Sequence, residues 1–316
     1  MTCLRCWHTK VKKFGTYGRK RIQRYRCADC KATFSDRQPR PLGTHIISVE
    51  RATQIISLML EGMSVRAISR LTGAEKKTIL SLLLTIGRKC ATLFDSRVRG
   101  IRPRYLELDE TWAFVHTKEK HLGLDDPNEW GDTYTWIALD AETKLVVSYL
   151  VGKRDAASAF TFVRDLSERV VGRCQVTSDG FRSYIPAIEE YFGADVDFAQ
   201  LVKIMGRADN AGPGWYGPAT VIETIPTPIT GDPDPEHIST SYVERSNLSV
   251  RMHLRRFTRL TNAHSKSLTH LEAAVAIYMS WYNLCRVHQT LRVTPAMQAG
   301  LADHVWEMEE LLTWKS

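Results

Sequence analysis

Residues 105–115 read YLELDETWAFV, and this alternation of apolar and polar residues is typical of a β-strand with one buried face. Working outward, we expect further elements in the order strand, strand, helix, strand, helix, at residues 133–140, 144–152, 156–170, 174–180 and 183–192. The order βββαβα is that of an RNase H-like α/β core, in which an antiparallel trio lies beside parallel strands.

The chain beyond this core predicts one more strand, an insertion and two helices. DFAQLVKIM (197–205) has the composition of a strand, whereas residues 206–240 are rich in Gly, Pro and Asp and predict an irregular segment. The closing helices are expected at 241–257 and 268–284. We therefore predict an RNase H-like domain at 105–290 with an insertion at 206–240, followed by a C-terminal tail at 291–316.

Three carboxylates occupy informative positions on this predicted fold. Asp109 lies on the first strand, Asp179 ends the fourth strand, and Glu244 begins the helix after the insertion. The first and fourth strands of an RNase H-like sheet are neighbours, so the two aspartates should face each other with Glu244 approaching from the packed helix. Oxygen ligands suit hard cations such as Mg²⁺ or Mn²⁺, and two such ions about 3.5–4 Å apart serve in-line phosphoryl transfer. The pattern predicts a two-ion catalytic site at Asp109, Asp179 and Glu244.

Each carboxylate also has a simpler interpretation, which the residues alone leave open. An acidic residue within a strand is usually solvated, and Glu110 should be so because it points away from the face of Asp109. Asp179 precedes Gly180 and fits a turn, while Glu244 fits the first turn of a helix, where the dipole favours an acid.

Four of the seven cysteines form two pairs near the N-terminus, in the pattern C-x2-C, twenty residues, C-x2-C. Two such pairs make a closed tetrahedral zinc site, which is structural rather than catalytic. The segment between them is polar and basic, so metal binding is expected to drive its folding. The pattern predicts a zinc ribbon at 1–38, with Zn²⁺ held by Cys3, Cys6, Cys27 and Cys30. The remaining cysteines are expected to be inert buried side chains: Cys90, Cys174 and Cys285.

Residues 48–89 show helical periodicity in three short blocks, with Ser48 and Ser64 as candidate N-caps and Gly62 and Gly73 as breaks. This pattern indicates a helix-turn-helix DNA-binding domain at 45–95, followed by a basic linker at 97–104. The third helix would then enter the major groove and offer the residues at its start, Lys76, Lys77 and Thr78. A plain helical bundle or dimerisation domain has the same periodicity, and that alternative stays open.

Charge is distributed unevenly along the chain. Residues 1–104 hold 23 Lys and Arg against 6 Asp and Glu, a net charge of +17, whereas the remaining residues hold 20 against 29, a net charge of −9. So basic a module is expected to bind a polyanion, and double-stranded DNA is the partner that the motifs favour. Further phosphate contacts are predicted on the helix that carries Glu244, at Arg245, Arg251, Arg255 and Arg256. A solvated amphipathic helix is the alternative for that segment.

The chain has neither a run of about 20 apolar residues, which a membrane span needs, nor the apolar core of a signal peptide at its N-terminus. We therefore expect a soluble cytoplasmic protein that associates with the nucleoid and makes no membrane contact. The odd number of cysteines also disfavours a disulfide framework.

These segments together resemble the insertion-sequence-one family of bacterial DDE transposases, in its longer single-chain form. The resemblance covers nearly the whole chain. It rests on CLRC…RYRCADCKATFSD, the three-helix block, LDETWAFV around Asp109, TSDGFRSY around Asp179, HISTSYVERSNLSVRMHLRRFTRLTNAHSKS around Glu244, and YNLCRVHQTLRVTPAMQAG.

The resemblance implies Mg²⁺-dependent hydrolysis at transposon ends, followed by attack of the freed 3′-OH on target DNA. It assigns Asp109, Asp179 and Glu244 to the metal-binding triad, and Arg251 to the basic residue seven positions after the glutamate. Two features depart from the shorter members of the family. The ribbon and the catalytic domain form one continuous chain here, and the insertion at 206–240 is longer.

Two other functions remain open on the sequence. A nuclease or resolvase with the same fold would hydrolyse DNA without strand transfer, and a regulator derived from a transposase would bind DNA without cutting it. The intact carboxylate triad disfavours the regulator. Because transposition joins two ends of one element, at least a homodimer is expected on DNA.

Overall fold

The structure is a computed structural model, and it describes residues 2–3, 5–18, 21–35, 41–206, 220–258 and 261–315. The chain divides into two compact units, Met1–Thr44 and His45–Ser316. Within the described residues of the first unit, the strands are β1 (Val11–Tyr17), β2 (Ile22–Cys27) and β3 (Thr33–Ser35). They pair antiparallel in the order β1-β2-β3, so this short basic segment forms a small meander.

The second unit begins with three helices, α1 (Val49–Leu60), α2 (Val65–Thr72) and α3 (Lys76–Arg97). Both predicted caps are confirmed, because Ser48 Oγ accepts from the N–H of Arg51 at 3.3 Å and Ser64 Oγ accepts from the N–H of Ala67 at 3.2 Å. Gly73 ends α2 at φ +66°, a left-handed conformation that glycine adopts without strain. The third helix is longer than the periodicity indicated, and it takes up the start of the expected linker.

A six-stranded mixed sheet forms the centre of the second unit. Its strands are β4 (Tyr105–Val115), β5 (Gly131–Asp140), β6 (Val146–Gly152), β7 (Cys174–Asp179), β8 (Val196–Gly206) and β9 (Thr220–Thr230). Their order is β6-β5-β4-β7-β8-β9, with β4, β7 and β8 mutually parallel and the other neighbours antiparallel. The first five strands in this order fit an RNase H-like core, as the sequence predicted.

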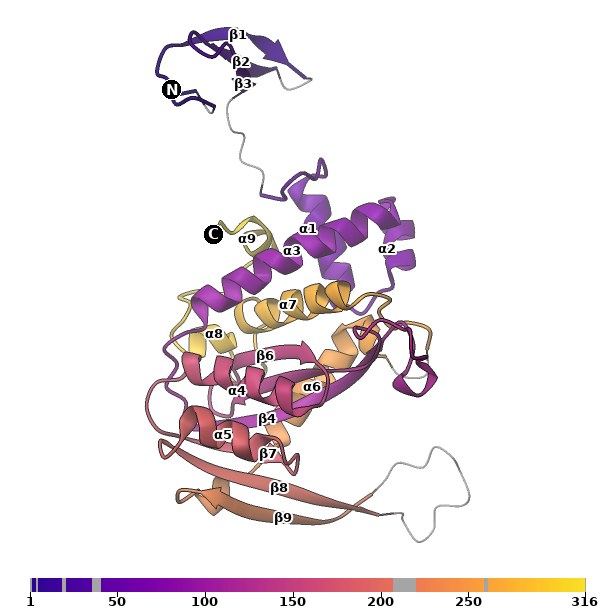
Figure 1. The fold of residues 1–316 in the computed structure, drawn as a ribbon, viewed down its shortest axis with the longest axis vertical. Coiled ribbons are helices and arrows are strands. Elements are labelled where there is room, and N and C mark those ends of the chain that lie inside the picture. Colours follow the sequence, from indigo (N-terminus) through magenta and orange to yellow (C-terminus); the bar gives the residue numbers. More distant parts are fainter. Residues whose placement is uncertain are drawn as a thin grey trace. The chain divides into compact units, whose positions relative to one another are not determined.

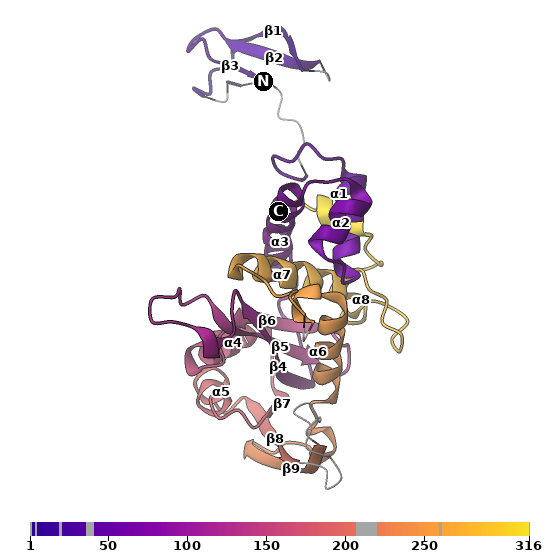
Figure 2. The ribbon, with the colours of Figure 1, turned by 90° about the vertical axis from the view of Figure 1, so that its right-hand side faces the viewer.

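Helices cover both faces of this sheet. The remaining helical elements are α4 (Ala156–Arg169), α5 (Tyr184–Phe192), α6 (Ser241–His253), α7 (Leu268–Leu284), α8 (Pro295–Gln298) and α9 (Met308–Thr313), with 3₁₀ turns η1 (Glu119–His121), η2 (Pro235–His237) and η3 (Arg255–Phe257). Figure 1 shows α4 and α5 in front of the strands, and Figure 2 shows them on one side with α6 on the other. The face under α4 and α5 is closed by the buried side chains of Trp136, Phe162 and Tyr184.

The expectation of a wholly irregular insertion at 206–240 is wrong for its second half. Residues 220–230, TVIETIPTPIT, form the strand β9 and pair antiparallel with β8. Thr, Val and Ile favour a strand, and Pro226 and Pro228 are tolerated because β9 is the last strand of the sheet, where one row of N–H groups needs no partner. The prolines that indicated a loop therefore mark an edge strand. Residues 207–219 lie outside the described residues.

The helix α7 joins the sheet to the N-terminal helices. Its Asn283 donates to the carbonyl of Val146 at 2.9 Å and accepts from the N–H of Val146 at 3.0 Å, which completes the pairing of the edge strand β6. On its other side α7 packs against α3, as Figures 1 and 2 both show. Among the described helices, none is long and apolar enough to cross a lipid bilayer.

Gly87 allows α3 and α7 to approach closely. A Cβ atom at Gly87 would lie 2.4 Å from Ala273 Cβ and 2.6 Å from Ala273 Cα. Helix propensity favours Ala over Gly by about 1 kcal/mol in a helix interior, but this overlap has to push the two helices apart. We expect Gly87→Ala to lower the free energy of unfolding by about 1–3 kcal/mol, as overpacking does. Urea denaturation measures this change, and a stabilised Gly87→Ala protein would contradict the close approach. Gly123→Ala is the control, because its Cβ would meet only Asp126 Oδ2 at an ordinary 3.7 Å.

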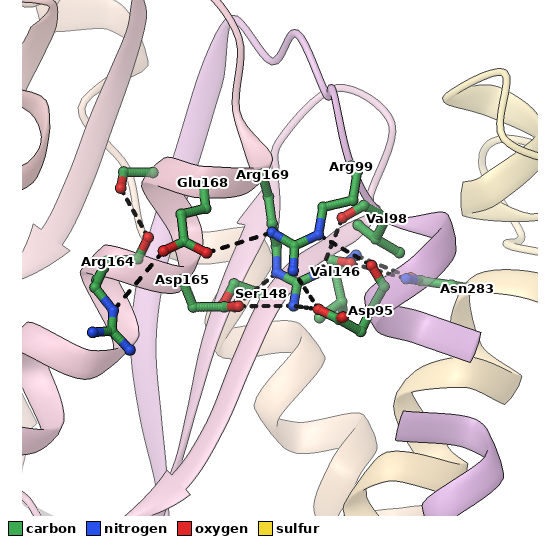
Figure 3. Close-up of polar contacts among 11 residues, drawn as sticks. Asp95, Val98, Arg99, Val146, Ser148, Arg164, Asp165, Glu168, Arg169 and Asn283 are labelled. Atoms are coloured by element: carbon green, nitrogen blue, oxygen red, sulfur yellow. Dashed lines mark hydrogen bonds and ion pairs between the residues drawn. The ribbon is translucent and has the colours of Figure 1, made fainter. Parts of the chain in front are cut away.

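A buried arginine ties the end of α3 to the sheet. The Arg169 side chain is only 6% exposed; it binds both carboxylate oxygens of Asp165 at 2.7 and 2.8 Å, Asp95 at 2.9 Å and the carbonyl of Val98 at 2.9 Å. Asp165 in turn accepts from the hydroxyl of Ser148 on β6. Figure 3 shows this network, in which α3, α4 and β6 meet around one guanidinium.

Removing this guanidinium leaves acceptors on α4 and at the end of α3 without their shared donor. We expect Arg169→Met to lower the free energy of unfolding by roughly 1–3 kcal/mol, because the buried carbonyl of Val98 and the part-buried carboxylate of Asp165 lose their donor. Arg164→Met on the same helix is the matched control. Its ion pair with Glu168 is 4.0 Å long with both side chains more than half exposed, so a change below about 0.5 kcal/mol is expected. Equal losses in the two variants, measured by thermal and urea denaturation, would contradict the role of Arg169.

Candidate active site

The register of two parallel strands brings Asp109 and Asp179 together. Leu108 on β4 pairs with Ser178 on β7, so the next residue of each strand is an aspartate. Asp109 and Asp179 therefore lie side by side where β7 ends, and each offers a carboxylate oxygen within 4.8 Å of the other. This adjacency follows from the central position of β4 and β7 in the sheet.

Glu110 belongs to the same acidic cluster, contrary to the expectation that it is solvated. Its carboxylate lies within 4.8 Å of those of Asp109 and Asp179, and its side chain is only 2% exposed. It does point to the other face of β4, where it accepts from the hydroxyl of Tyr184 on α5. Because α5 covers that face, the outward-pointing side of the strand is buried here. The sequence pattern alone did not reveal this covering.

The helix α6 places Glu244 and Asn247 against the sheet on the opposite face. Asn247 Nδ2 donates to Asp109 Oδ2 at 2.7 Å, and this side chain is buried. Glu244 lies outside the tight cluster of three carboxylates, because its Oε1 accepts from Thr240 and from Lys203 on β8. Glu244 nevertheless lines the same cavity as Asp109 and Asp179, as does Arg251. The structure thus gathers around one cavity all three carboxylates that were predicted to act together.

This cavity has a volume of about 830 Å³ and is lined by both acidic and basic side chains. Arg154 lies between two of the carboxylates, 3.0 Å from Glu110 Oε2 and 2.9 Å from Asp179 Oδ2, and its guanidinium stacks 4.1 Å from the ring centre of Phe181. Lys203 pairs with Glu244. A cation on β8 and one on the segment between β6 and α4 thereby offset part of the repulsion among clustered carboxylates.

Burial raises the pKa of two of these carboxyl groups. The pKa of Asp109 rises to about 6, chiefly through burial and further through the charges of Asp179 and Glu244. The pKa of Glu110 rises to about 7, again chiefly through burial, and the charge of Asp179 raises it further. The hydrogen bonds of Glu110 with Tyr184 and Arg154 lower this pKa in part. Carboxylates that are this poorly solvated gain from a nearby cation.

The donor set fits hard divalent cations. Carboxylate oxygens of Asp109, Glu110 and Asp179 converge, and Glu244 reaches the same cavity from α6. Asn247 Oδ1 is buried and has no hydrogen-bond partner among the described residues. This oxygen can therefore accept a hydrogen bond or bind a cation. Oxygen ligands of this kind suit Mg²⁺ or Mn²⁺ better than softer metals.

The four N-terminal cysteines converge as the sequence predicted, and their geometry fits zinc. The Sγ atoms of Cys3 and Cys30 are 3.6 Å apart, as are those of Cys6 and Cys27, and all four lie within 4.8 Å of one another. Zn–S bonds of about 2.3 Å in a tetrahedron separate the sulfur atoms by about 3.8 Å.

Each Cys-x2-Cys pair of this site is followed by a residue with a left-handed backbone. Trp7 follows Cys6 at φ +60°, and Lys31 follows Cys30 at φ +58°. The two pairs thus form turns of the same kind. The backbone N–H of Arg5 donates to Cys3 Sγ at 3.4 Å and lowers the pKa of that thiol, which favours the thiolate that zinc requires.

The residues predicted to contact DNA lie in different environments. Lys76 and Lys77 are exposed in the first turn of α3, and Thr78 beside them is partly buried. Arg245 and Arg255 are exposed, whereas burial lowers the pKa of Arg256 to about 10.

The expected helix at 241–257 ends earlier, at His253, and Arg255 and Arg256 lie on the 3₁₀ turn η3. These two arginines therefore do not continue the helix that carries Arg245 and Arg251. Leu254, which separates α6 from η3, is buried, so the chain turns inward at this point.

Sequence reasoning missed Arg154, Lys203 and Asn247 as members of the site. Asn247 had a detectable signal, since it lies one helical turn after Glu244 on the same face. Arg154 and Lys203 had none, because each lies in a different element and reaches the carboxylates only through the packing of the sheet.

A scan against protein-family models finds no match, and a search of curated proteins finds none either. Among solved structures, the chain is similar to a piggyBac transposase synaptic complex with hairpin DNA, at 13% sequence identity and a TM-score of 0.35. The likeness covers 84% of this chain and 69% of that chain.

Proposed function

We propose that this protein is a DNA transposase of the bacterial insertion-sequence-one type, which cleaves DNA at transposon ends and joins the freed 3′-OH to target DNA. The observation that carries the proposal is the register of β4 and β7, which sets Asp109 beside Asp179 in a cavity that Glu244 also lines. Convergent carboxylates at the centre of an RNase H-like sheet are the arrangement that two-ion phosphoryl transfer requires.

In this proposal Asp109, Asp179 and Glu244 hold two Mg²⁺ or Mn²⁺ ions, with Glu110 and Asn247 beside them. Ions bound there would supply a polarised attacking oxygen and stabilise the departing one. The residues of the chain orient the reaction. Asn247 fixes the carboxylate of Asp109 by donating a hydrogen bond, and Arg251 at the cavity offers a cation for a DNA phosphate.

The N-terminal parts supply DNA binding in the same proposal. The four cysteines would hold a structural zinc ion. The strand β2 carries Arg24 and Arg26, whose guanidinium groups lie 6.0 and 5.4 Å from the ring centre of Phe14 on β1. The exposed start of α3, with Lys76, Lys77 and Thr78, would lie in the major groove as the recognition helix of a helix-turn-helix domain. Arg245 and Arg255 would contact phosphates near the active site. Two ends must be held together, so the active form would be at least a homodimer on DNA.

The test uses purified protein, labelled DNA from both flanks of its coding sequence and a supercoiled target plasmid, with Mg²⁺ or with EDTA. We expect Mg²⁺-dependent products in which flank DNA is joined to the plasmid, and sequencing the junctions then identifies the ends. Cleavage without joining would favour a nuclease or resolvase with the same carboxylates. Binding without cleavage in any divalent metal would favour a DNA-binding regulator.

A further inference from the structure

Glu107 is a buried carboxylate that the proposed chemistry does not use. It lies on β4 two residues before Asp109, on the same face of the strand, and is only 2% exposed. Its Oε2 accepts from the backbone N–H groups of Tyr242 at 2.7 Å and Val243 at 2.9 Å. Glu107 does not line the cavity, so its hydrogen-bond partners are groups of the protein itself.

Those two N–H groups belong to the first turn of α6, where a helix has amide donors without partners of its own. The N-cap residue Thr240 makes no capping hydrogen bond, because its hydroxyl donates to Glu244 instead. A carboxylate from the sheet thus replaces the usual cap. A negative charge is also favoured at a helix N-terminus.

A second hydrogen bond joins the same strand to the same helix. Asn247 Nδ2 donates to Asp109 Oδ2 at 2.7 Å. Val243 and Asn247 are four residues apart on the helix, a rise of about 6 Å, and Glu107 and Asp109 are two residues apart on the strand, a rise of about 6.8 Å. The spacings match, so strand and helix are joined at two points. Two points fix both the height of the helix and its rotation, which sets the direction of Glu244 between them.

We propose that Glu107 is a positioning residue that fixes α6 on the sheet, so that Glu244 faces the cavity beside Asp109 and Asp179. The inference rests on the proposed function in one respect, since it takes Glu244 as a ligand of the divalent ion. The attachment of α6 to the sheet does not depend on that assumption. Removing a residue that orients a metal ligand without touching the metal typically lowers the affinity for the metal by about 10–100-fold.

The experiment compares Glu107→Ala and Glu107→Gln with the matched control Asn283→Ala. Gln keeps a carbonyl oxygen that accepts from both amides, whereas Ala removes it. Asn283→Ala also removes two buried hydrogen bonds to backbone, but at β6 and not at the cavity. The readouts are hydrogen exchange of the α6 amides, thermal stability, and binding of Mn²⁺ followed by electron paramagnetic resonance. The four-cysteine site prefers softer metals, so it does not obscure this signal.

In Glu107→Ala we expect the amides of Tyr242 and Val243 to exchange at least about tenfold faster, and Mn²⁺ to bind about 10–100-fold more weakly. Glu107→Gln should restore both properties to within a few-fold of wild type. Asn283→Ala should lose thermal stability while keeping the exchange of α6 and the affinity for Mn²⁺. If Glu107→Ala does not fold, Glu107→Asp replaces it, since a side chain shorter by one methylene cannot reach both amides.

The proposal would be overturned if Glu107→Ala kept the wild-type exchange rate of the α6 amides and the wild-type affinity for Mn²⁺. Equal losses of Mn²⁺ affinity in Glu107→Ala and Asn283→Ala would overturn it as well. Failure of the proposed function has a different signature. The wild-type protein would then bind no Mn²⁺ at the carboxylates, while the exchange of the Tyr242 and Val243 amides would still decide whether Glu107 holds α6.

Discussion

We expect Asp109→Asn to abolish Mg²⁺-dependent strand cleavage while leaving the binding of end DNA unchanged. Asn keeps the size of the side chain and removes one anionic oxygen from a cluster whose carboxylates lie within 4.8 Å of one another. Metal ions contribute several kcal/mol to the stabilisation of the transition state, which corresponds to a loss of roughly 10²–10⁴-fold in rate. Cleavage of labelled end DNA measures the rate, and electrophoretic mobility shift measures the affinity.

Asp179→Asn and Glu244→Gln are expected to give the same result, because both residues line the cavity with Asp109. The matched control is Glu236→Gln, which replaces an exposed acid on the turn η2 outside this cavity and should keep full activity. Near-normal cleavage by any one of the three variants would refute the assignment of that residue to the ion-binding set.

We expect Cys27→Ser to unfold the zinc ribbon and to weaken the binding of end DNA. The Sγ atom of Cys27 lies 3.6 Å from that of Cys6, and its side chain is 1% exposed, so Ser removes one ligand from a closed site. Zinc binding supplies about 10–16 kcal/mol of folding free energy in small zinc domains, and little else stabilises three short strands. We expect loss of bound zinc by mass spectrometry under native conditions, and at least about a tenfold loss of end affinity.

The control for this prediction is Cys285→Ser, which changes a cysteine in the second unit at the end of α7. It should retain zinc and bind DNA normally. If Cys27→Ser lost zinc but bound end DNA with unchanged affinity, the ribbon would not take part in DNA recognition. Retention of zinc in Cys27→Ser would refute the four-cysteine site itself.

The strand of Asp109 was predictable from its alternation of apolar and polar residues, and the strand of Asp179 because it is short, largely buried and followed by a turn residue. The edge strand β9 was not, since Pro226 and Pro228 indicate a loop unless the strand is known to lie at an edge. Glu110 was predicted on the correct face but with the wrong surroundings. A pattern of period two states which residues share a face, and it does not state which helix covers that face.

The sequence by itself determined the order of the strands and helices from β4 to β8, the caps Ser48 and Ser64, the spacing of the four cysteines and the positions of the three carboxylates, because these features depend on patterns within short segments. Only the tertiary structure decided which carboxylates Arg154 and Lys203 pair with at the cavity, that Glu107 meets the start of α6, and where Glu244 points. These side chains come from different elements, and their contacts depend on the register of β4 with β7 and on the packing of α6 against the sheet. The physical reason is that hydrogen bonds and ion pairs form between neighbours in space, whereas a local pattern specifies only neighbours along the chain.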